Sequence, residues 1–171
     1  GSGAAIISNK GEGPFVTHIT TGKIVDMGVK DANNMGAAMA AAATDTMYQH
    51  FKDTGRAPSY YDLILTGDLS TYGSSCFKKM ALAYGINLGN NYFDSGLMLY
   101  DLEKQDVHAG GSGCGCVSLV MLGYIVKQMY ENKLKKVEVL PLEQDKLIAI
   151  IITDKGHIEH KQITVENVSL E

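Results

Sequence analysis

Apolar residues recur at helical spacing in the first half of the chain. Positions 39, 43, 47 and 51 are Met, Ala, Met and Phe, and one apolar residue every four positions is typical of a helix face packed on a core. This pattern predicts a helix over residues 36–51, capped by Asn33 or Asn34 and ended at residues 53–55. A second helix is expected over residues 74–84, closed by Gly85.

Short apolar runs bounded by turn residues predict strands around these helices. Residues 4–8 indicate a buried strand, and residues 15–25 alternate well enough to form one or two more. Further strands are expected at residues 61–66 and 96–100, with a polar, turn-rich segment at residues 89–96.

The second half of the chain has one long apolar segment followed by short runs. Residues 116–132 are expected to form a helix, residues 137–142 and 147–153 two strands, and residues 161–165 a third. Helices alternating with strands predict an α/β fold, with helices packed on a layered mixed β-sheet. We expect one domain over residues 1–171, with an atypical terminal strand segment at residues 137–171.

Composition narrows the class of protein. The chain has 171 residues, 45% apolar and 20% charged, which is typical of a globular domain. Its net charge is −4 and its basic residues are scattered, so we expect no nucleic-acid partner. No apolar run approaches the roughly 20 residues needed to span a bilayer, and no leader pattern opens the chain, so a cytoplasmic location is expected. The odd count of three cysteines favours free thiols.

A glycine-rich run precedes the long predicted helix and is the sharpest local feature. Residues 110–115 are Gly-Gly-Ser-Gly-Cys-Gly. Glycines let the backbone approach a ligand, and N–H groups at a helix start favour a carboxylate or phosphate. Close packing of the helix against a neighbour explains the same glycines equally well. Gly111, Ser112 and Gly113 are therefore candidate ligand residues.

Two cysteines and a histidine lie in or beside this run. Cys114 and Cys116 lack the second cysteine pair that a zinc site needs, so we expect no metal there. A nucleophilic thiolate would need a base, for which His108 is the nearest candidate in sequence. Small buried thiols are the simpler interpretation, and Cys76 is expected in the core.

Two candidates lie elsewhere in the sequence. Asp68 follows a predicted buried strand, where open α/β sheets place functional groups, although an aspartate capping the next helix is equally consistent. His18 lies on a predicted strand, where it could contact a ligand or face a half-buried surface. His157 and His160 are expected at the surface.

Five segments resemble the stage V sporulation protein AD family of the thiolase-like superfamily, and the likeness covers about residues 3–136. The segments are residues 11–14 (Gly-Glu-Gly-Pro), 20–26 (Thr-Thr-Gly-Lys-Ile-Val-Asp), 34–40 (Asn-Met-Gly-Ala-Ala-Met-Ala), 61–69 (Tyr-Asp-Leu-Ile-Leu-Thr-Gly-Asp-Leu) and 106–116 (Asp-Val-His-Ala-Gly-Gly-Ser-Gly-Cys-Gly-Cys). The chain matches the C-terminal half of that family.

The resemblance implies a thiolase-like half-domain that binds dipicolinic acid, a pyridine dicarboxylate often paired with calcium. It also implies membrane partners in uptake into the spore and a location peripheral to the forespore inner membrane. Calcium is expected only as a companion of the ligand, and no other cofactor is expected. Because thiolase-like sites lie between two similar halves, a pocket on this half alone should be incomplete.

The tail departs from that family. Residues 139–142, 149–159 and 167–171 resemble part of the heat-inducible repressor family that controls chaperone operons. That part omits the DNA-binding region, so it carries no regulatory function over. Its two apolar strands are expected to complete the thiolase-like sheet.

Three functional hypotheses follow. The leading one is a non-catalytic module that binds a small dicarboxylate through His108, Gly111, Ser112, Gly113, Cys114, Asp68 and His18. The second is a thiolase-like acyltransferase half with a cysteine nucleophile. The third is a structural or dimerisation domain, because the apolar face of a separated half would favour a homodimer.

Overall fold

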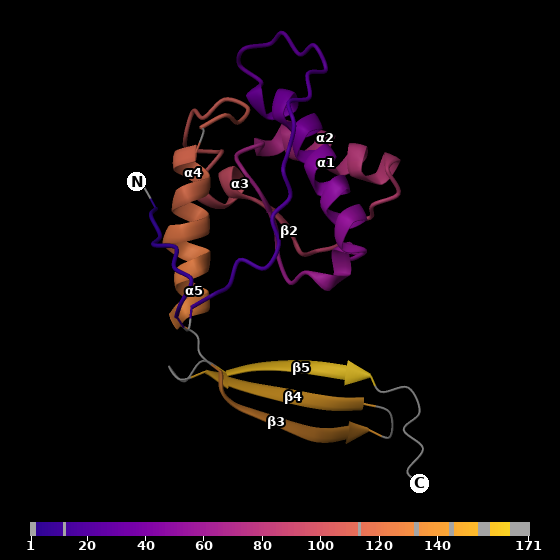
Figure 1. Ribbon diagram of the computed structural model, residues 1–171, viewed down its shortest axis with the longest axis vertical. Helices are drawn as coiled ribbons and strands as arrows, with labels where there is room; N and C mark the ends of the chain where they lie inside the picture. Colours follow the sequence, from indigo (N-terminus) through magenta and orange to yellow (C-terminus); the bar gives the residue numbers. More distant parts are fainter. Residues whose placement is uncertain are drawn as a thin grey trace. The chain divides into compact units, whose positions relative to one another are not determined.

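The computed structural model of the protein describes residues 3–11, 13–112, 114–131, 134–143, 146–153 and 158–164 (Figure 1). The chain forms two compact units. One contains residues 1–11 and 15–124, and the other contains residues 12–14 and 125–171. The single domain expected from the sequence stays a prediction.

The first helix confirms the sequence pattern closely. Helix α1 (Met35–Thr54) is capped by Asn34, whose side-chain Oδ1 accepts a hydrogen bond from the Ala37 N–H at 3.2 Å. It ends at Gly55, which has φ +66° and donates its N–H to the Phe51 carbonyl at 2.9 Å. A left-handed residue at this position favours glycine, and it satisfies a carbonyl that the helix leaves unpaired.

Helix α2 (Ser70–Ala83) packs against α1 through small residues (Figure 1). A Cβ placed on Gly73 would lie 2.5 Å from the carbonyl carbon of Gly36, so both positions require glycine for this close approach. Phe77 of α2 is 1% exposed and forms the core with Ala40, Leu69 and Tyr92. Helix α2 was predicted to begin at residue 74 and begins one turn earlier.

Two short strands lie beside these helices. Strand β1 (Ile64–Thr66) pairs in parallel with β2 (Tyr92–Asp94), with Ile64 opposite Tyr92. The short 3-10 helix η1 (Pro58–Tyr60) precedes β1. The strand predicted at residues 61–66 is confirmed in its second half, whereas β2 lies in a segment that we expected to be turns.

Three predicted strands are wrong. Residues 4–8 and 15–25 form no strand, and Ile6, Ile19 and Ile24 are 98%, 86% and 97% exposed. Alternation alone does not make a strand, since a ladder also needs a partner edge. Residues 96–100 largely form helix α3 (Ser95–Leu99) instead, because the Asp94 carboxylate accepts the N–H groups of Gly96 and Leu97 as an N-cap.

The long helical segment predicted at residues 116–132 is confirmed in type. It begins two residues earlier, as α4 (Cys114–Ser118), η2 (Leu119–Ile125) and α5 (Val126–Glu131) in direct succession. Segment η2 has π-helical hydrogen bonding. Such wide turns are rare and locally shift which side chains share a helix face.

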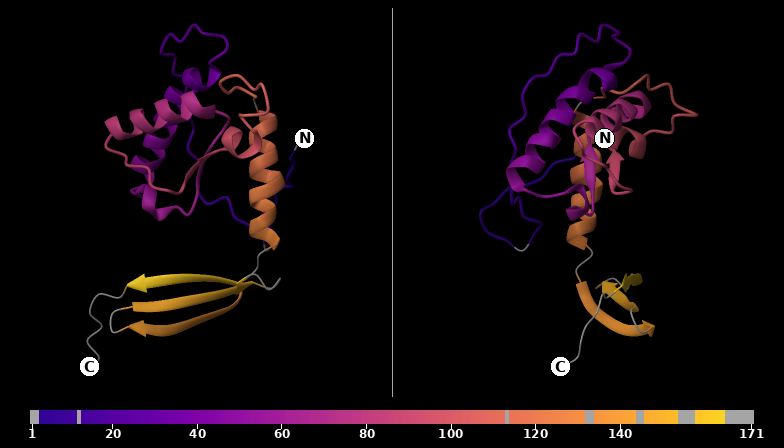
Figure 2. Two further views of the ribbon diagram at one scale, coloured as in Figure 1. Left: turned by 180° about the vertical axis from the view of Figure 1, so that it is seen from behind. Right: turned by 90° about the vertical axis from the view of Figure 1, so that its right-hand side faces the viewer.

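The second unit contains an antiparallel sheet in the order β3-β4-β5 (Figure 2). Its strands are β3 (Leu134–Glu143), β4 (Lys146–Thr153) and β5 (Ile158–Thr164), as predicted in number and type. Pro141 lies in β3, an edge strand that tolerates a missing N–H. These strands pair with one another, and β1 pairs with β2. That the tail strands complete the thiolase-like sheet stays a prediction.

Candidate functional site

Asp68 holds the glycine-rich loop, residues 108–112, in place. Its side chain is buried, and its Oδ2 accepts the Ser112 N–H at 3.1 Å. Its backbone carbonyl accepts the Gly111 N–H at 3.0 Å. The structure therefore brings together three of the predicted site residues. It also uses the N–H groups of Gly111 and Ser112, two of the three loop residues that we expected to bind a ligand anion.

Asp94 supports the same region and was missed by sequence reasoning. It is 2% exposed, and its Oδ2 accepts the Leu69 N–H at 2.9 Å and the Thr66 hydroxyl at 2.8 Å. Its Oδ1 accepts the N–H groups of Ser70, Gly96 and Leu97 at 3.1–3.2 Å. Burial raises the pKa of this carboxyl above its ordinary value, and the hydrogen bonds oppose that rise. Asp94 thus joins the starts of α2 and α3.

The start of α1 completes this assembly. The Gly36 N–H donates to the Ala109 carbonyl at 2.8 Å, and the Ala109 N–H donates to the Asn33 carbonyl at 3.3 Å. A Cβ on Gly110, which has φ +86°, would lie 2.6 Å from the Asp68 carbonyl oxygen. Close packing therefore accounts for Gly110, as the alternative interpretation of the glycine-rich run expected.

His108 projects from this fixed backbone. It has φ +50°, a left-handed conformation uncommon outside glycine, and its side chain is 66% exposed. Its Nδ1 lies 3.9 Å from Asp106 Oδ1. Residues in sparsely populated backbone regions cluster at functional sites. His108 is therefore the predicted site residue whose geometry most favours contact with a ligand.

The two cysteines near the loop differ in environment. Cys114 is exposed, whereas Cys116 is 3% exposed and directs its Sγ to the Ser95 hydroxyl at 3.7 Å. The predicted partner of a nucleophilic thiol, His108, has its Nδ1 3.9 Å from Asp106 Oδ1. Gly113, also a predicted site residue, lies outside the described residues.

His18 is not part of this assembly. Its Nδ1 lies 3.0 Å from the Thr17 hydroxyl and 3.5 Å from Arg56 Nη1. Arg56 follows the C-terminal end of α1, whereas Gly36, near the other end, contacts the loop. A helix of 20 residues is about 30 Å long. The structure therefore separates His18 from the other candidates.

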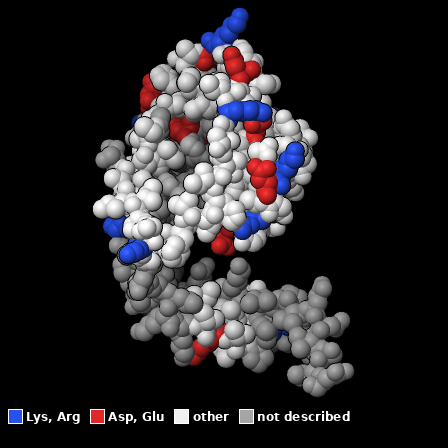
Figure 3. Space-filling view, in the orientation of Figure 1, with Lys and Arg blue, Asp and Glu red and all other residues white. Residues whose placement is uncertain are grey.

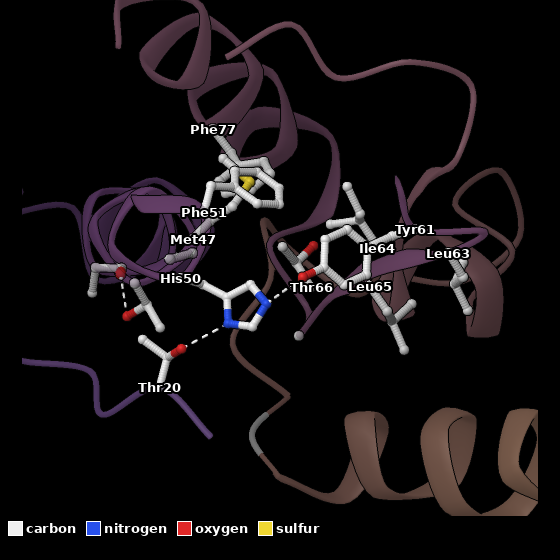
Figure 4. A pocket seen from close by; sticks show the side chains of 14 residues that line it. Thr20, Met47, His50, Phe51, Tyr61, Leu63, Ile64, Leu65, Thr66 and Phe77 are labelled. Atoms are coloured by element: carbon white, nitrogen blue, oxygen red, sulfur yellow. Dashed lines mark hydrogen bonds between the residues drawn. The ribbon is translucent and has the colours of Figure 1, made fainter. Parts of the chain in front are cut away.

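A cavity of about 540 Å³ lies beside β1 and was also missed (Figure 4). His50 of α1 lies at its centre in a hydrogen-bonded chain, 2.7 Å from the Thr20 hydroxyl and 2.7 Å from the Tyr61 hydroxyl. The remaining lining is largely apolar and includes Met47 and Phe51. The helix pattern that predicted α1 indicated its apolar face but gave no sign of His50.

Neither the surface charge nor the arrangement of potential metal ligands points to a further site among the described residues. Figure 3 shows Lys and Arg side chains interspersed with Asp and Glu on the described part of one face. Among the residues that the structure describes, no three His, Cys, Asp or Glu side chains are grouped to hold a metal ion. No helix in the same ranges is long and apolar enough to cross a membrane.

Comparison with known proteins identifies the family. A relative from Bacillus subtilis (strain 168), stage V sporulation protein AD, is 46% identical over 140 residues, which cover 82% of this chain and 41% of the relative. The chain thus spans about two fifths of the length of that relative. The heat-inducible transcription repressor HrcA of Bacillus pumilus (strain SAFR-032) is 46% identical over 37 residues, 22% of this chain and 11% of the repressor. Both resemblances expected from the sequence are confirmed. The family model for stage V sporulation protein AD matches residues 1–153, beyond the expected limit at residue 136, and the chain belongs to this sporulation family.

Proposed function

We propose that the chain binds a small dicarboxylate, dipicolinic acid, at the exposed edge of the glycine-rich loop and does so without catalysis. The observations that carry the proposal are the left-handed backbone of His108 and the 66% exposure of its side chain, on a loop whose backbone is hydrogen-bonded to Asp68 and Gly36. An imidazole N–H is a good donor to a carboxylate. Membership of a sporulation family supports the choice of ligand.

The predicted site residues divide into two roles in this proposal. His108 and the exposed Cys114 contact the ligand, because their side chains are accessible. Asp68, Gly111 and Ser112 position the loop, because their polar groups are already bonded to one another. His18 is removed from the site.

A fixed loop lowers the entropic cost of binding. The loop is joined to α1 through Gly36 and to the start of α2 through Asp68. A ligand that binds such a loop need not order it first. The Asp68 carboxylate already accepts the Ser112 N–H, so this N–H is not available to the anion of a ligand. The ligand carboxylate therefore depends mainly on His108.

Calorimetric titration of the chain with dipicolinic acid, with and without calcium, tests this proposal. We expect saturable binding, and we expect His108→Ala to weaken it by about tenfold or more, since a hydrogen bond to a charged group contributes about 1.5–3 kcal/mol. His18→Ala is the matched control and should leave affinity unchanged. Equal weakening by both substitutions, or no heat with the parent chain at millimolar ligand, would contradict the proposal.

A further inference from the structure

Met35, the first residue of α1, lies directly against the glycine-rich loop. A Cβ placed on Gly111 would lie 2.6 Å from Met35 Cβ and 3.0 Å from Met35 Cγ. The stem of Met35 therefore occupies the side of Gly111 on which any other residue would carry its side chain. Met35 is nevertheless 47% exposed, so part of it is accessible to a ligand.

Two backbone hydrogen bonds hold the start of α1 and the loop in this arrangement. The Gly36 N–H donates to the Ala109 carbonyl at 2.8 Å, and the Ala109 N–H donates to the Asn33 carbonyl at 3.3 Å. Residues before and after Met35 are thus bonded to the same residue of the loop. These bonds keep the backbone of Met35 beside Gly111 whether or not a ligand is bound.

His108 lies on the same short turn as Gly111. His108, Gly110 and Gly111 have φ of +50°, +86° and +89°, so the backbone turns here instead of extending. Even a fully extended chain of three residues spans at most about 11 Å. Ala109 is 8% exposed, whereas the side chain of His108 is 66% exposed. The imidazole and the Met35 side chain are therefore carried by backbone positions close enough for one small ligand to contact both.

A methionine beside a hydrogen-bond donor suits one chemical class of ligand. The thioether of methionine is polarizable and makes favourable contacts with aromatic rings, with the sulfur about 5 Å from the ring. An imidazole N–H donates to a carboxylate. A planar aromatic acid can use both groups at once. An aliphatic dicarboxylate can use the imidazole but has no ring to place against the sulfur.

We propose that Met35 makes the site selective for aromatic carboxylates. The ring of the ligand packs on the Met35 side chain while a carboxylate of the ligand accepts a hydrogen bond from His108. This inference rests on the proposed function and adds to it a contact for the ring, which none of the residues predicted from the sequence supplies. Gly111 serves the same contact, because any side chain at this position would displace Met35.

Titration of the full chain with two ligands, followed by nuclear magnetic resonance, tests this contact. Glutarate has the same number of atoms between its carboxylates as dipicolinic acid but no ring. Met35→Ala should weaken the binding of dipicolinic acid about five- to tenfold and leave the binding of glutarate unchanged. Met35→Leu keeps the apolar bulk and should restore most of the affinity. Met129→Ala removes another exposed methionine, is the matched control, and should bind both ligands as the parent does.

A second readout reports the contact itself. The ring current of bound dipicolinic acid should move the ε-methyl resonance of Met35 and leave that of Met129 in place, whereas glutarate should move neither. An unmoved Met35 methyl resonance, an unchanged affinity of Met35→Ala for dipicolinic acid, or equal weakening of both ligands would overturn this inference and leave the proposed function standing. Absence of dipicolinic acid binding to the parent chain would instead contradict the proposed function, and this inference with it.

Discussion

Replacing Gly36 with alanine should strongly destabilise the first unit. A Cβ at this position would collide with the Leu69 carbonyl oxygen and lie 2.8 Å from the Ala109 carbonyl oxygen. Both neighbours are backbone atoms, so a side-chain rotation cannot relieve the clash. The backbone of Gly36 also packs closely against Gly73. Relief therefore requires α1 to move away from α2 or from the glycine-rich loop.

The magnitude follows from three contributions. Overpacking of a filled site costs about 1–3 kcal/mol. Loss of the 2.8 Å hydrogen bond from the Gly36 N–H to the Ala109 carbonyl adds about 0.5–1.5 kcal/mol. The better helix propensity of alanine returns about 1 kcal/mol. We expect a net loss of about 3 kcal/mol in the free energy of unfolding, near the upper end because the clash is with backbone on two sides.

Urea unfolding followed by far-ultraviolet circular dichroism measures this loss, because the signal reports the helices. Gly115→Ala is the matched control. Gly115 is also helical, but no atom lies within 4 Å of its added Cβ. This control should be stabilised by up to about 1 kcal/mol. If the two variants differ by less than about 1 kcal/mol, the close packing inferred at Gly36 is refuted.

Three other predictions concern single side chains. Burial raises the pKa of Asp94, so the folded chain binds the proton of the Asp94 carboxyl more tightly than the unfolded chain does. The contribution of Asp94 to the free energy of unfolding should therefore fall as pH rises from 3.8 through the folded pKa. Urea titrations of the parent and of Asp94→Asn should show that fall only in the parent. Cys114 should react with a thiol reagent about a hundredfold faster than the buried Cys116, which mass spectrometry of labelled peptides can check, and equal rates would contradict the burial. In Gly96→Ala the added Cβ would collide with the Asp68 carboxylate, which accepts the Ser112 N–H. Amide hydrogens of the glycine-rich loop should therefore exchange about tenfold faster. Unchanged exchange would show that the bond between Asp68 and Ser112 is not needed to hold the loop.

Local signals in the sequence predicted the helices well. Helix α1 depends on Asn34 at its start, Gly55 at its end and apolar residues four apart, all of which are read within one segment. The three strands of the second unit were predicted for the same reason, because each is a short apolar run read within its own segment, whereas their pairing in a separate antiparallel sheet was not predicted. The strands predicted at residues 4–8 and 15–25 failed because pairing depends on another part of the chain.

Sequence reasoning found a residue of the candidate site only where its neighbours in the sequence determine its place in the fold. Asp68 was found because it follows a strand, and its bond to Ser112 was not, since 44 positions separate them. Asp94 was missed because β2 has only three residues in a polar setting. His18 was misplaced because the sequence does not show that a 20-residue helix separates it from the loop.

The hydrogen bond between Asp68 and Ser112 cannot form until both residues have been synthesised. A ribosome adds about 5–20 residues per second, so the 44 positions between the two take roughly 2–9 s to make. During that interval Leu69 and Phe77, which end fully enclosed, are already part of the nascent chain. Chaperones that recognise apolar segments therefore have several seconds in which to bind the nascent chain before the glycine-rich loop has been synthesised and can pack against Asp68.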